Sequence, residues 1–237
     1  MAEHLTPAFV LHRRPYTDTS LLLELYTPNA GRLPAIARGA RSPAARGSWL
    51  QPFQPLLVQW RGRGDVKTLS RFEARGNPLA LHGRRLYCGV YINELMLRLV
   101  PREDPADELF VAYEQTLRDL VTTPDIESLL RHFEVRLLKS LGYALPLDRT
   151  VAGESVEAQG YYRYSVEMGP EACGEADAGV VKGQTLLSLA HRHPLAEKRL
   201  RQEARNLMRR VLDHYLDYKP LKSRELFKPA RQENRES

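Results

Sequence analysis

The segment Ser20-Leu21-Leu22-Leu23-Glu24-Leu25-Tyr26, continued by Thr27-Pro28-Asn29-Ala30-Gly31, decides how the first part of the chain folds. Its first half is a short apolar run typical of a strand, and its second half is a turn rich in Pro, Asn and Gly. Residues 32–38 are then expected to return as the next strand. Three further segments are expected to form strands: residues 8–12, 55–60 and 66–72. Five short strands in about 70 residues predict a small closed barrel, of the OB type or an SH3-like type, because closure removes the sheet edges.

From residue 79 onward, the apolar residues follow a helical period. The first helical stretch is apolar on nearly every side, which predicts that it forms the centre of a second domain. The expected helices cover residues 86–100, 105–121, 125–141, 184–191 and 195–218.

Six glycines interrupt residues 146–183, where acidic residues outnumber basic ones. Two strand-like pieces, 161–166 and 178–181, predict a loop-rich insertion with a small hairpin. The predicted fold class is therefore α+β: a five-stranded barrel over residues 1–78, then an α-helical domain over 79–237 that contains the insertion.

The positive charge of the chain is concentrated in the barrel segment. The 237 residues carry a net charge of +6. Residues 1–80 contain 11 lysines and arginines against five acidic residues, whereas residues 81–237 contain 24 of each. A small basic module has a field that attracts polyanions. Ten of the 11 cations are arginines, whose planar fork grips phosphate through two hydrogen bonds.

Residues 39–48 combine small residues with arginines and lack an apolar anchor, so we expect an exposed loop that shapes itself to a phosphate backbone. Contacts to sugar and phosphate carry no sequence information, which predicts binding without base preference. Trp49 beside this loop is a candidate base-stacking residue, whereas Trp60 is expected in the core. The candidate DNA-binding cations are Arg38, Arg41, Arg46, Arg61, Arg63 and Lys67, together with Arg13 and Arg14.

A second row of cations lies on the last long helix. Lys198, Arg201, Arg205 and Arg209 are spaced by three or four residues, so their side chains line one face. This face is either a solvated surface or a contact for a polyanion or an acidic partner, and the sequence leaves both interpretations open.

Motifs for catalysis are missing from the sequence. It contains no phosphate-binding P-loop, no complete dinucleotide fingerprint, no H-E-x-x-H and no C-x-x-C. The acidic residues of 103–108 could hold Mg²⁺ in a nuclease, but carboxylates are also favoured at the start of a helix. We therefore predict a non-enzymatic protein with no catalytic residues, no metal ligands and no cofactor.

Three features of the sequence predict the cellular compartment. No apolar run reaches the roughly 20 residues that span a bilayer, and residues 1–7 lack the pattern of a secretory signal. Two cysteines, Cys88 and Cys173, are too few for a disulfide framework. We expect a cytoplasmic protein without a membrane partner.

Several motifs resemble those of the bacterial RecO family of DNA repair proteins, in the same order over nearly the whole chain. They are Gly39-Ala40-Arg41-Ser42, residues 50–56, residues 62–69, residues 86–95, Arg131-His132-Phe133-Glu134, residues 141–143 and residues 219–227.

This resemblance implies an OB-fold barrel and a recombination mediator associated with the nucleoid. Such proteins bind single- and double-stranded DNA, anneal complementary strands, and with RecR help to load RecA onto DNA coated by single-stranded-DNA-binding protein (SSB). They also bind the acidic, apolar C-terminal tail of SSB through the helical domain. The candidate tail-binding residues are Arg131, Arg201, Arg205 and Arg209.

Many members carry four cysteines for zinc in the irregular insertion. Residues 147–153 contain none here, and only Cys173 follows, so a zinc-less insertion is expected. The alternative function is an interaction adaptor of the recombination machinery whose barrel does not itself bind DNA.

Overall fold

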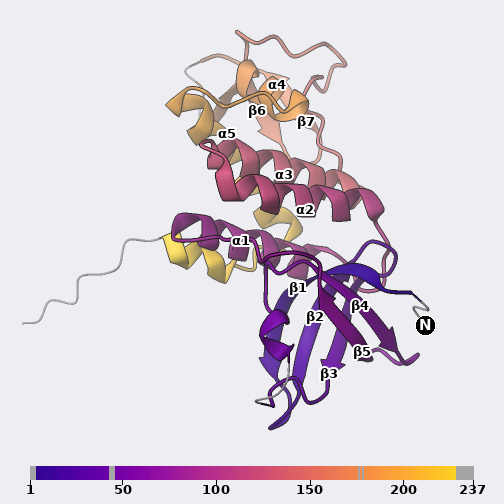
Figure 1. Cartoon of the computed structure of the whole chain (residues 1–237). Coiled ribbons are helices and arrows are strands. Elements are labelled where there is room, and N and C mark those ends of the chain that lie inside the picture. Colours follow the sequence, from indigo (N-terminus) through magenta and orange to yellow (C-terminus); the bar gives the residue numbers. More distant parts are fainter. Residues whose placement is uncertain (1–3, 43–45, 176, 178, 228–237) are drawn as a thin grey trace, which may run out of the picture.

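The computed structural model describes all residues except 1–3, 43–45, 176, 178 and 228–237. A closed five-stranded barrel forms the first part of the chain, and a helical domain with a small sheet forms the rest (Figure 1). The predicted fold class is therefore confirmed.

The barrel strands are linked in the order β1-β2-β3-β5-β4, and β4 pairs back to β1. β3 and β5 run parallel, while the other neighbours are antiparallel. This closed arrangement is of the OB type. The strands are β1 Thr6–Pro15, β2 Leu21–Thr27, β3 Gly31–Ala37, β4 Leu56–Arg61 and β5 Lys67–Ala74.

Alternate residues of the strands fill the barrel. Leu23, Leu25, Leu33 and Val58 are fully buried, and Trp60 is 7% exposed, in agreement with its expected place in the core. The 3-10 helix η1 (Arg46–Trp49) lies between β3 and β4. Strand alternation therefore accounts for which barrel residues face inward.

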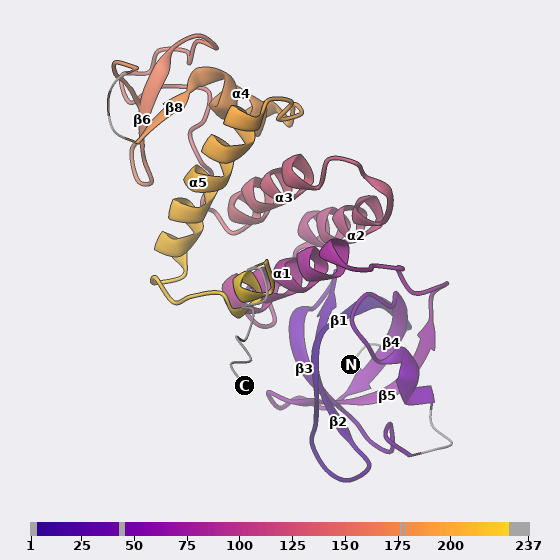
Figure 2. The ribbon, with the colours of Figure 1, turned by 90° about the vertical axis from the view of Figure 1, so that its left-hand side faces the viewer.

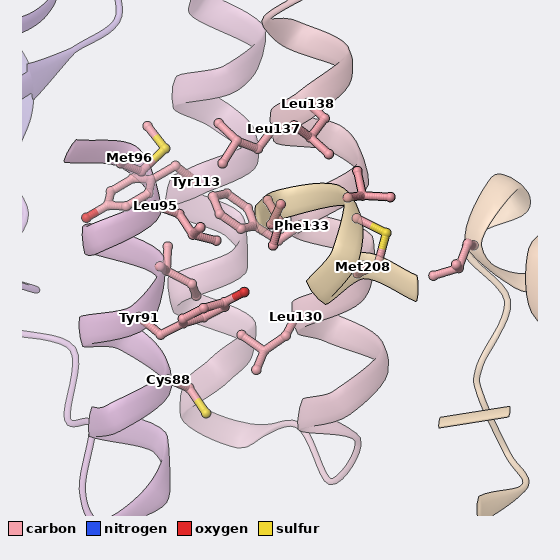
Figure 3. Close-up of a cluster of buried hydrophobic side chains, with 14 of the residues drawn as sticks. Cys88, Tyr91, Leu95, Met96, Tyr113, Leu130, Phe133, Leu137, Leu138 and Met208 are labelled. Atoms are coloured by element: carbon pink, nitrogen blue, oxygen red, sulfur yellow. The ribbon is translucent and has the colours of Figure 1, made fainter. Parts of the chain in front are cut away.

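The helical domain is built around α1, as the all-round apolar character of its sequence predicts. Side chains from α1, α2, α3 and α5 meet in a continuous cluster that includes Tyr113, Phe133 and Met208 (Figure 3). The helices are α1 Arg84–Leu99, α2 Asp107–Thr122, α3 Ile126–Ser140, α4 Gly183–His191 and α5 Lys198–Tyr215, followed by the 3-10 helix η2 Lys222–Phe227.

The insertion contains three strands where a two-stranded hairpin was predicted. They are β6 Tyr161–Ser165, β7 Gly169–Ala172 and β8 Val180–Lys182, in the order β7-β6-β8. β7 was missed because Gly-Pro-Glu-Ala has no strand pattern, and it forms by pairing with β6. Part of the predicted second piece, residue 178, lies outside the described residues.

The barrel interior forms its own hydrophobic cluster, but several barrel side chains join the core of the helical domain. Phe9 and Tyr26 of the barrel pack against Phe110 and Tyr113 of α2, with ring centroids 5.3–5.9 Å apart. Burial, with smaller effects of nearby carboxylates, raises the pKa of Tyr26 far above its usual range. The Asn93 amide of α1 donates to the Leu11 carbonyl at 3.1 Å. The two domains are therefore held in one fixed arrangement, and one end of the barrel projects away from the helices (Figures 1 and 2).

Candidate functional site

The strand register gathers most of the predicted DNA-binding arginines at the projecting end of the barrel. The end of β1 lies against the start of β2, which pairs with the end of β3. The turn between β4 and β5, with Arg61 and Arg63, lies elsewhere, because Lys67 at the start of β5 bonds both to the Gly64 carbonyl of this turn and to Glu103 at the joint with the helical domain. We call the cations at the ends of β1 and β3 the arginine end: Arg13, Arg14, Arg38 and Arg41.

Within the described residues, neither these four arginines nor Arg61 and Arg63 form an ion pair with a carboxylate. All six are exposed. Arg13 Nη1 donates to the Leu50 carbonyl at 3.1 Å, and Arg41 Nη1 donates to the Thr17 carbonyl at 2.7 Å. Neither bond neutralises the charge, so the arginine end remains electropositive and open to an anionic ligand.

Arginines at the joint between the domains are arranged differently. Arg75 Nη2 lies 2.6 Å from a carboxylate oxygen of Glu114. Arg32 and Arg102 both contact Glu24, at 3.3 and 2.6 Å. These arginines at the joint are therefore paired with carboxylates, whereas those of the arginine end have no such partner among the described residues.

Three further predicted residues also stand apart from the arginine end. Lys67 is 9% exposed; its ammonium donates to the Gly64 carbonyl at 2.9 Å and forms an ion pair with Glu103. It is therefore not placed to hold a phosphate. Trp49 is partly buried against the barrel core. The side chain of Arg46 and residues 43–45 of the predicted loop lie outside the described part.

A pocket of about 530 Å³ opens in the helical domain between α1, α3, α5 and η2. Five of its eleven lining residues are arginines, one is acidic, and the others are aromatic or aliphatic. Its positive and apolar character suits an acidic peptide with apolar side chains. The lining residues are Arg84, Tyr87, Tyr91, Glu127, Leu130, Arg131, Arg205, Arg209, Arg224, Leu226 and Phe227.

Arg131 is held in the wall of this pocket by a buried carboxylate. Its Nη2 lies 2.5 Å from Glu134 Oε1, and the Tyr91 hydroxyl donates to the same oxygen at 2.7 Å. Glu134 is fully buried, and burial raises the pKa of its carboxyl although Arg131 opposes that shift. Burial and Glu134 also raise the pKa of Tyr91 (seen in Figure 3 between α1 and α3), so the phenol stays a hydrogen-bond donor.

The rim of the pocket is organised by Glu127. Both of its carboxylate oxygens accept from Arg205 Nη2 at 2.7 Å, and Arg84 Nη2 donates to one of them at 3.1 Å. Burial opposes ionisation of this carboxyl, but the bonds from Arg205 and Arg84 outweigh it and lower the pKa of Glu127. One glutamate thus orients two arginines and neutralises only one of their charges.

The last described segment, η2, forms one side of the pocket. The Glu94 carboxylate accepts the backbone N–H groups of Lys222 and Ser223 at 2.9 and 2.8 Å. Arg224 Nη1 lies 2.5 Å from Asp213 Oδ1, and the Phe227 ring meets Tyr87 edge-on at 6.1 Å. These contacts place Leu226 and Phe227 on the pocket surface.

Of the four predicted tail-binding residues, Arg131, Arg205 and Arg209 line the pocket. Arg201 does not, because its guanidinium turns back to the carbonyls of Leu195 and Ala196 at 2.6 and 3.0 Å. Arg84 and Arg224 were not predicted as site residues. Residue 224 belongs to the family-like segment 219–227, which was the one signal that could have drawn attention to it.

The described residues include no group of three or more His, Cys, Asp or Glu side chains placed to share a metal ion. Within the same part of the chain, no helix has both the length and the apolar character needed to cross a membrane. Cys88 is buried, and burial raises the pKa of its thiol to about 11.

Comparisons with known proteins assign the chain to a class, that of recombination proteins. Residues 1–77 match the family model described as "Recombination protein O N terminal", and residues 81–225 match "Recombination protein O C terminal". The chain is also similar to curated proteins named "DNA repair protein RecO". The one from Alkalilimnicola ehrlichii is 47% identical over 226 residues, which cover 94% of this chain and 90% of that protein. The one from Pseudomonas aeruginosa is 45% identical and covers 92% of each. The chain therefore belongs to the RecO family of DNA repair proteins.

Proposed function

We propose that this protein is a non-enzymatic recombination mediator that acts in the cytoplasm, at the nucleoid. It binds single- and double-stranded DNA without sequence preference and anneals complementary strands. With RecR, it helps to load RecA onto single-stranded DNA coated by SSB. The observation that carries the DNA-binding part is the arginine end, a group of four exposed cations with no carboxylate partner among the described residues.

The chemistry of this end suits a phosphate backbone. Guanidinium groups form charge-assisted, bidentate hydrogen bonds with phosphate oxygens and do not depend on the bases. Neutralising phosphates also lowers the repulsion between two strands, which is what annealing requires. Binding releases counterions, so the affinity falls steeply as salt is added.

An electrophoretic mobility-shift series in increasing salt tests this proposal. The variant Arg13→Ala/Arg14→Ala/Arg38→Ala removes three exposed cations of the arginine end that have no carboxylate partner among the described residues. Each lost phosphate contact lowers the slope of log affinity against log salt by about 0.7 on single strands and about 0.9 on duplex. We expect weaker binding to every sequence and a slope reduced by about two to three.

The matched control is Lys139→Ala/Arg149→Ala/Arg210→Ala, which removes the same charge from exposed positions of the helical domain. It is expected to keep the salt slope of the unchanged protein. Equal slopes for both triple variants would contradict the assignment of DNA binding to the arginine end. Absent or salt-insensitive binding by the unchanged protein would favour the adaptor alternative.

We further propose that the helical pocket receives the acidic, apolar C-terminal tail of SSB. Carboxylates of the tail would meet Arg84, Arg205, Arg209 and Arg224, while apolar side chains would lie against Leu226 and Phe227. Charge-assisted bonds in a partly enclosed pocket are stronger than those on an open surface.

Titration of a fluorescent tail peptide tests the pocket, and α5 supplies a matched pair. Arg209→Ala removes a cation from the lining, whereas Arg201→Ala removes one outside it that donates to the carbonyls of Leu195 and Ala196. We expect about a tenfold loss of affinity for Arg209→Ala, equivalent to about 1.4 kcal/mol. Arg201→Ala is expected to bind as the unchanged protein does, and equal losses would place the tail elsewhere.

A further inference from the structure

The loop between β1 and β2 presents an aromatic ring at the arginine end. Tyr16 is 58% exposed, whereas Phe9, Tyr26 and Trp60 of the barrel are at most 7% exposed. Within the described residues, the Tyr16 ring makes no contact with another aromatic ring. A single exposed aromatic residue is common on protein surfaces, so its surroundings decide what it can do.

The loop that carries Tyr16 is tied down on both sides. The Tyr16 N–H donates to the Ser20 carbonyl at 3.0 Å, and the Ser20 N–H donates to Thr17 Oγ1 at 3.1 Å. Arg41 adds two bonds, from its backbone N–H to the Thr19 carbonyl at 2.9 Å and from Nη1 to the Thr17 carbonyl at 2.7 Å. The ring is therefore carried on an ordered backbone, and binding to it costs little ordering entropy.

Cations lie on both sides of this loop. Arg13 and Arg14 precede Tyr16 at the end of β1, and Arg41 is bonded to the loop itself. None of them is neutralised by a carboxylate among the described residues. A phosphate chain held by these arginines brings its bases within reach of the neighbouring ring.

We propose that Tyr16 stacks on an unpaired base of a DNA strand whose phosphates are held by the arginine end. This inference rests on the proposed DNA binding and adds to it a preference for single strands. Every base has a π-face, so stacking is indifferent to sequence. The bases of a duplex already stack on each other and offer no free face along the helix, so the ring contributes on single strands only.

The test compares three ligands at fixed salt by fluorescence anisotropy with the full chain. They are a labelled 20-nucleotide thymidine strand, a strand of the same length made of abasic nucleotides, and a 20-base-pair duplex. For Tyr16→Ala we expect about 5- to 150-fold weaker binding of the thymidine strand, the range that stacking of one base supplies. Binding of the abasic strand and of the duplex is expected to stay within about twofold.

Two further variants make the result specific. Tyr16→Phe keeps the ring and is expected to restore binding of the thymidine strand. Tyr218→Asn removes a tyrosine that is 75% exposed in the helical domain; asparagine suits its backbone, whose φ is 56°. This control is expected to bind all three ligands as the unchanged protein does.

The outcomes separate this inference from the proposed function. If Tyr16→Ala binds the thymidine strand normally while the arginine triple variant still loses its salt slope, stacking is overturned and DNA binding at this end stands. An equal loss on all three ligands also overturns stacking, because the abasic strand has no base to stack. If the unchanged protein binds none of them, both the proposed function and this inference fail.

Discussion

At the scale of single residues, Asn93 joins the two domains through one buried amide. Its Nδ2 donates to the Leu11 carbonyl of β1 at 3.1 Å, and its Oδ1 accepts from the Tyr113 hydroxyl of α2 at 2.7 Å. From the helical pattern alone, Asn93 is only a polar residue within a mostly apolar helix. Its role comes from a strand 82 residues away in the chain, and a single sequence does not reveal such a partner.

Replacing Asn93 with Ala is expected to destabilise the whole protein. The change leaves the Leu11 carbonyl and the Tyr113 hydroxyl buried without partners, at a cost of about 1–3 kcal/mol each. We expect the free energy of unfolding to fall by about 2–4 kcal/mol in urea titrations followed by circular dichroism. Tyr113→Phe leaves only the Asn93 amide oxygen without its hydrogen-bond donor, so it should lower the free energy of unfolding by about half as much. A loss below about 0.5 kcal/mol for Asn93→Ala would mean that water replaces both bonds.

At the scale of elements, the spacing of apolar residues in the sequence predicted the barrel and the five α-helices of the described residues. The predicted boundaries differ from the observed ones by a few residues. Asp125 caps α3 through a 3.1 Å bond from the Ser128 N–H, and Gly142 follows that helix with a φ of 84°; both residue types are typical of these helix ends. The pocket could not be predicted in this way, because its arginines come from α1, α3, α5 and η2. Periodicity shows which residues share one face, but it does not show which faces of different helices meet.

The turn between β2 and β3 depends on Gly31 for two reasons. Its φ is 62°, and a Cβ there would lie 2.1 Å from the Asp104 carbonyl oxygen. Gly39 has a similar φ of 70° but open space around it. Gly39→Ala should therefore cost only the backbone strain, about 1 kcal/mol, and Gly31→Ala at least twice that in thermal unfolding. Equal costs would mean that residues 102–106 move aside freely.

The attachment of η2 to α1 is expected to depend on pH. Burial alone would raise the pKa of Glu94, but the hydrogen bonds from Ser223 and Lys222 outweigh it and lower that pKa. A carboxylate with a lowered pKa stabilises the folded state above its ordinary value of 4.5, and this contribution is lost as the pH falls through the lowered pKa. NMR titration of the Lys222 and Ser223 amide signals should show a transition below pH 4.5. The same signals should show no such transition in Glu94→Gln.

At the scale of the whole molecule, the barrel and the helical domain depend on each other. Phe9, Leu11 and Tyr26 of the barrel belong to the same core cluster as α1 and α2. Two family models match the two parts separately, yet the side chains at their joint form one packed unit. Local patterns in the sequence indicate the parts, whereas the shared core arises only when they meet.

We therefore expect residues 1–78, expressed alone, to be much less stable than the same residues in the full chain. Isolation exposes the Phe9 and Tyr26 rings, and full burial of one large apolar side chain contributes about 1.5–3 kcal/mol. The full chain should unfold in one cooperative transition when followed by tryptophan fluorescence, since Trp49 and Trp60 report on the barrel. A cooperative transition of the isolated segment at the same denaturant concentration would show that the joint contributes little.

The arginine end and the helical pocket share no residue and lie on different domains of one rigid unit. On the proposed function, a nucleic-acid strand and a peptide would occupy the molecule together, and filling one surface would leave the other accessible. If the peptide belongs to a protein already bound to that strand, binding at one surface makes binding at the other surface intramolecular. The effective concentration of the second site is then of millimolar order, as it is for short flexible linkers. Two weak interactions would together bind the coated strand with much higher avidity than either one alone.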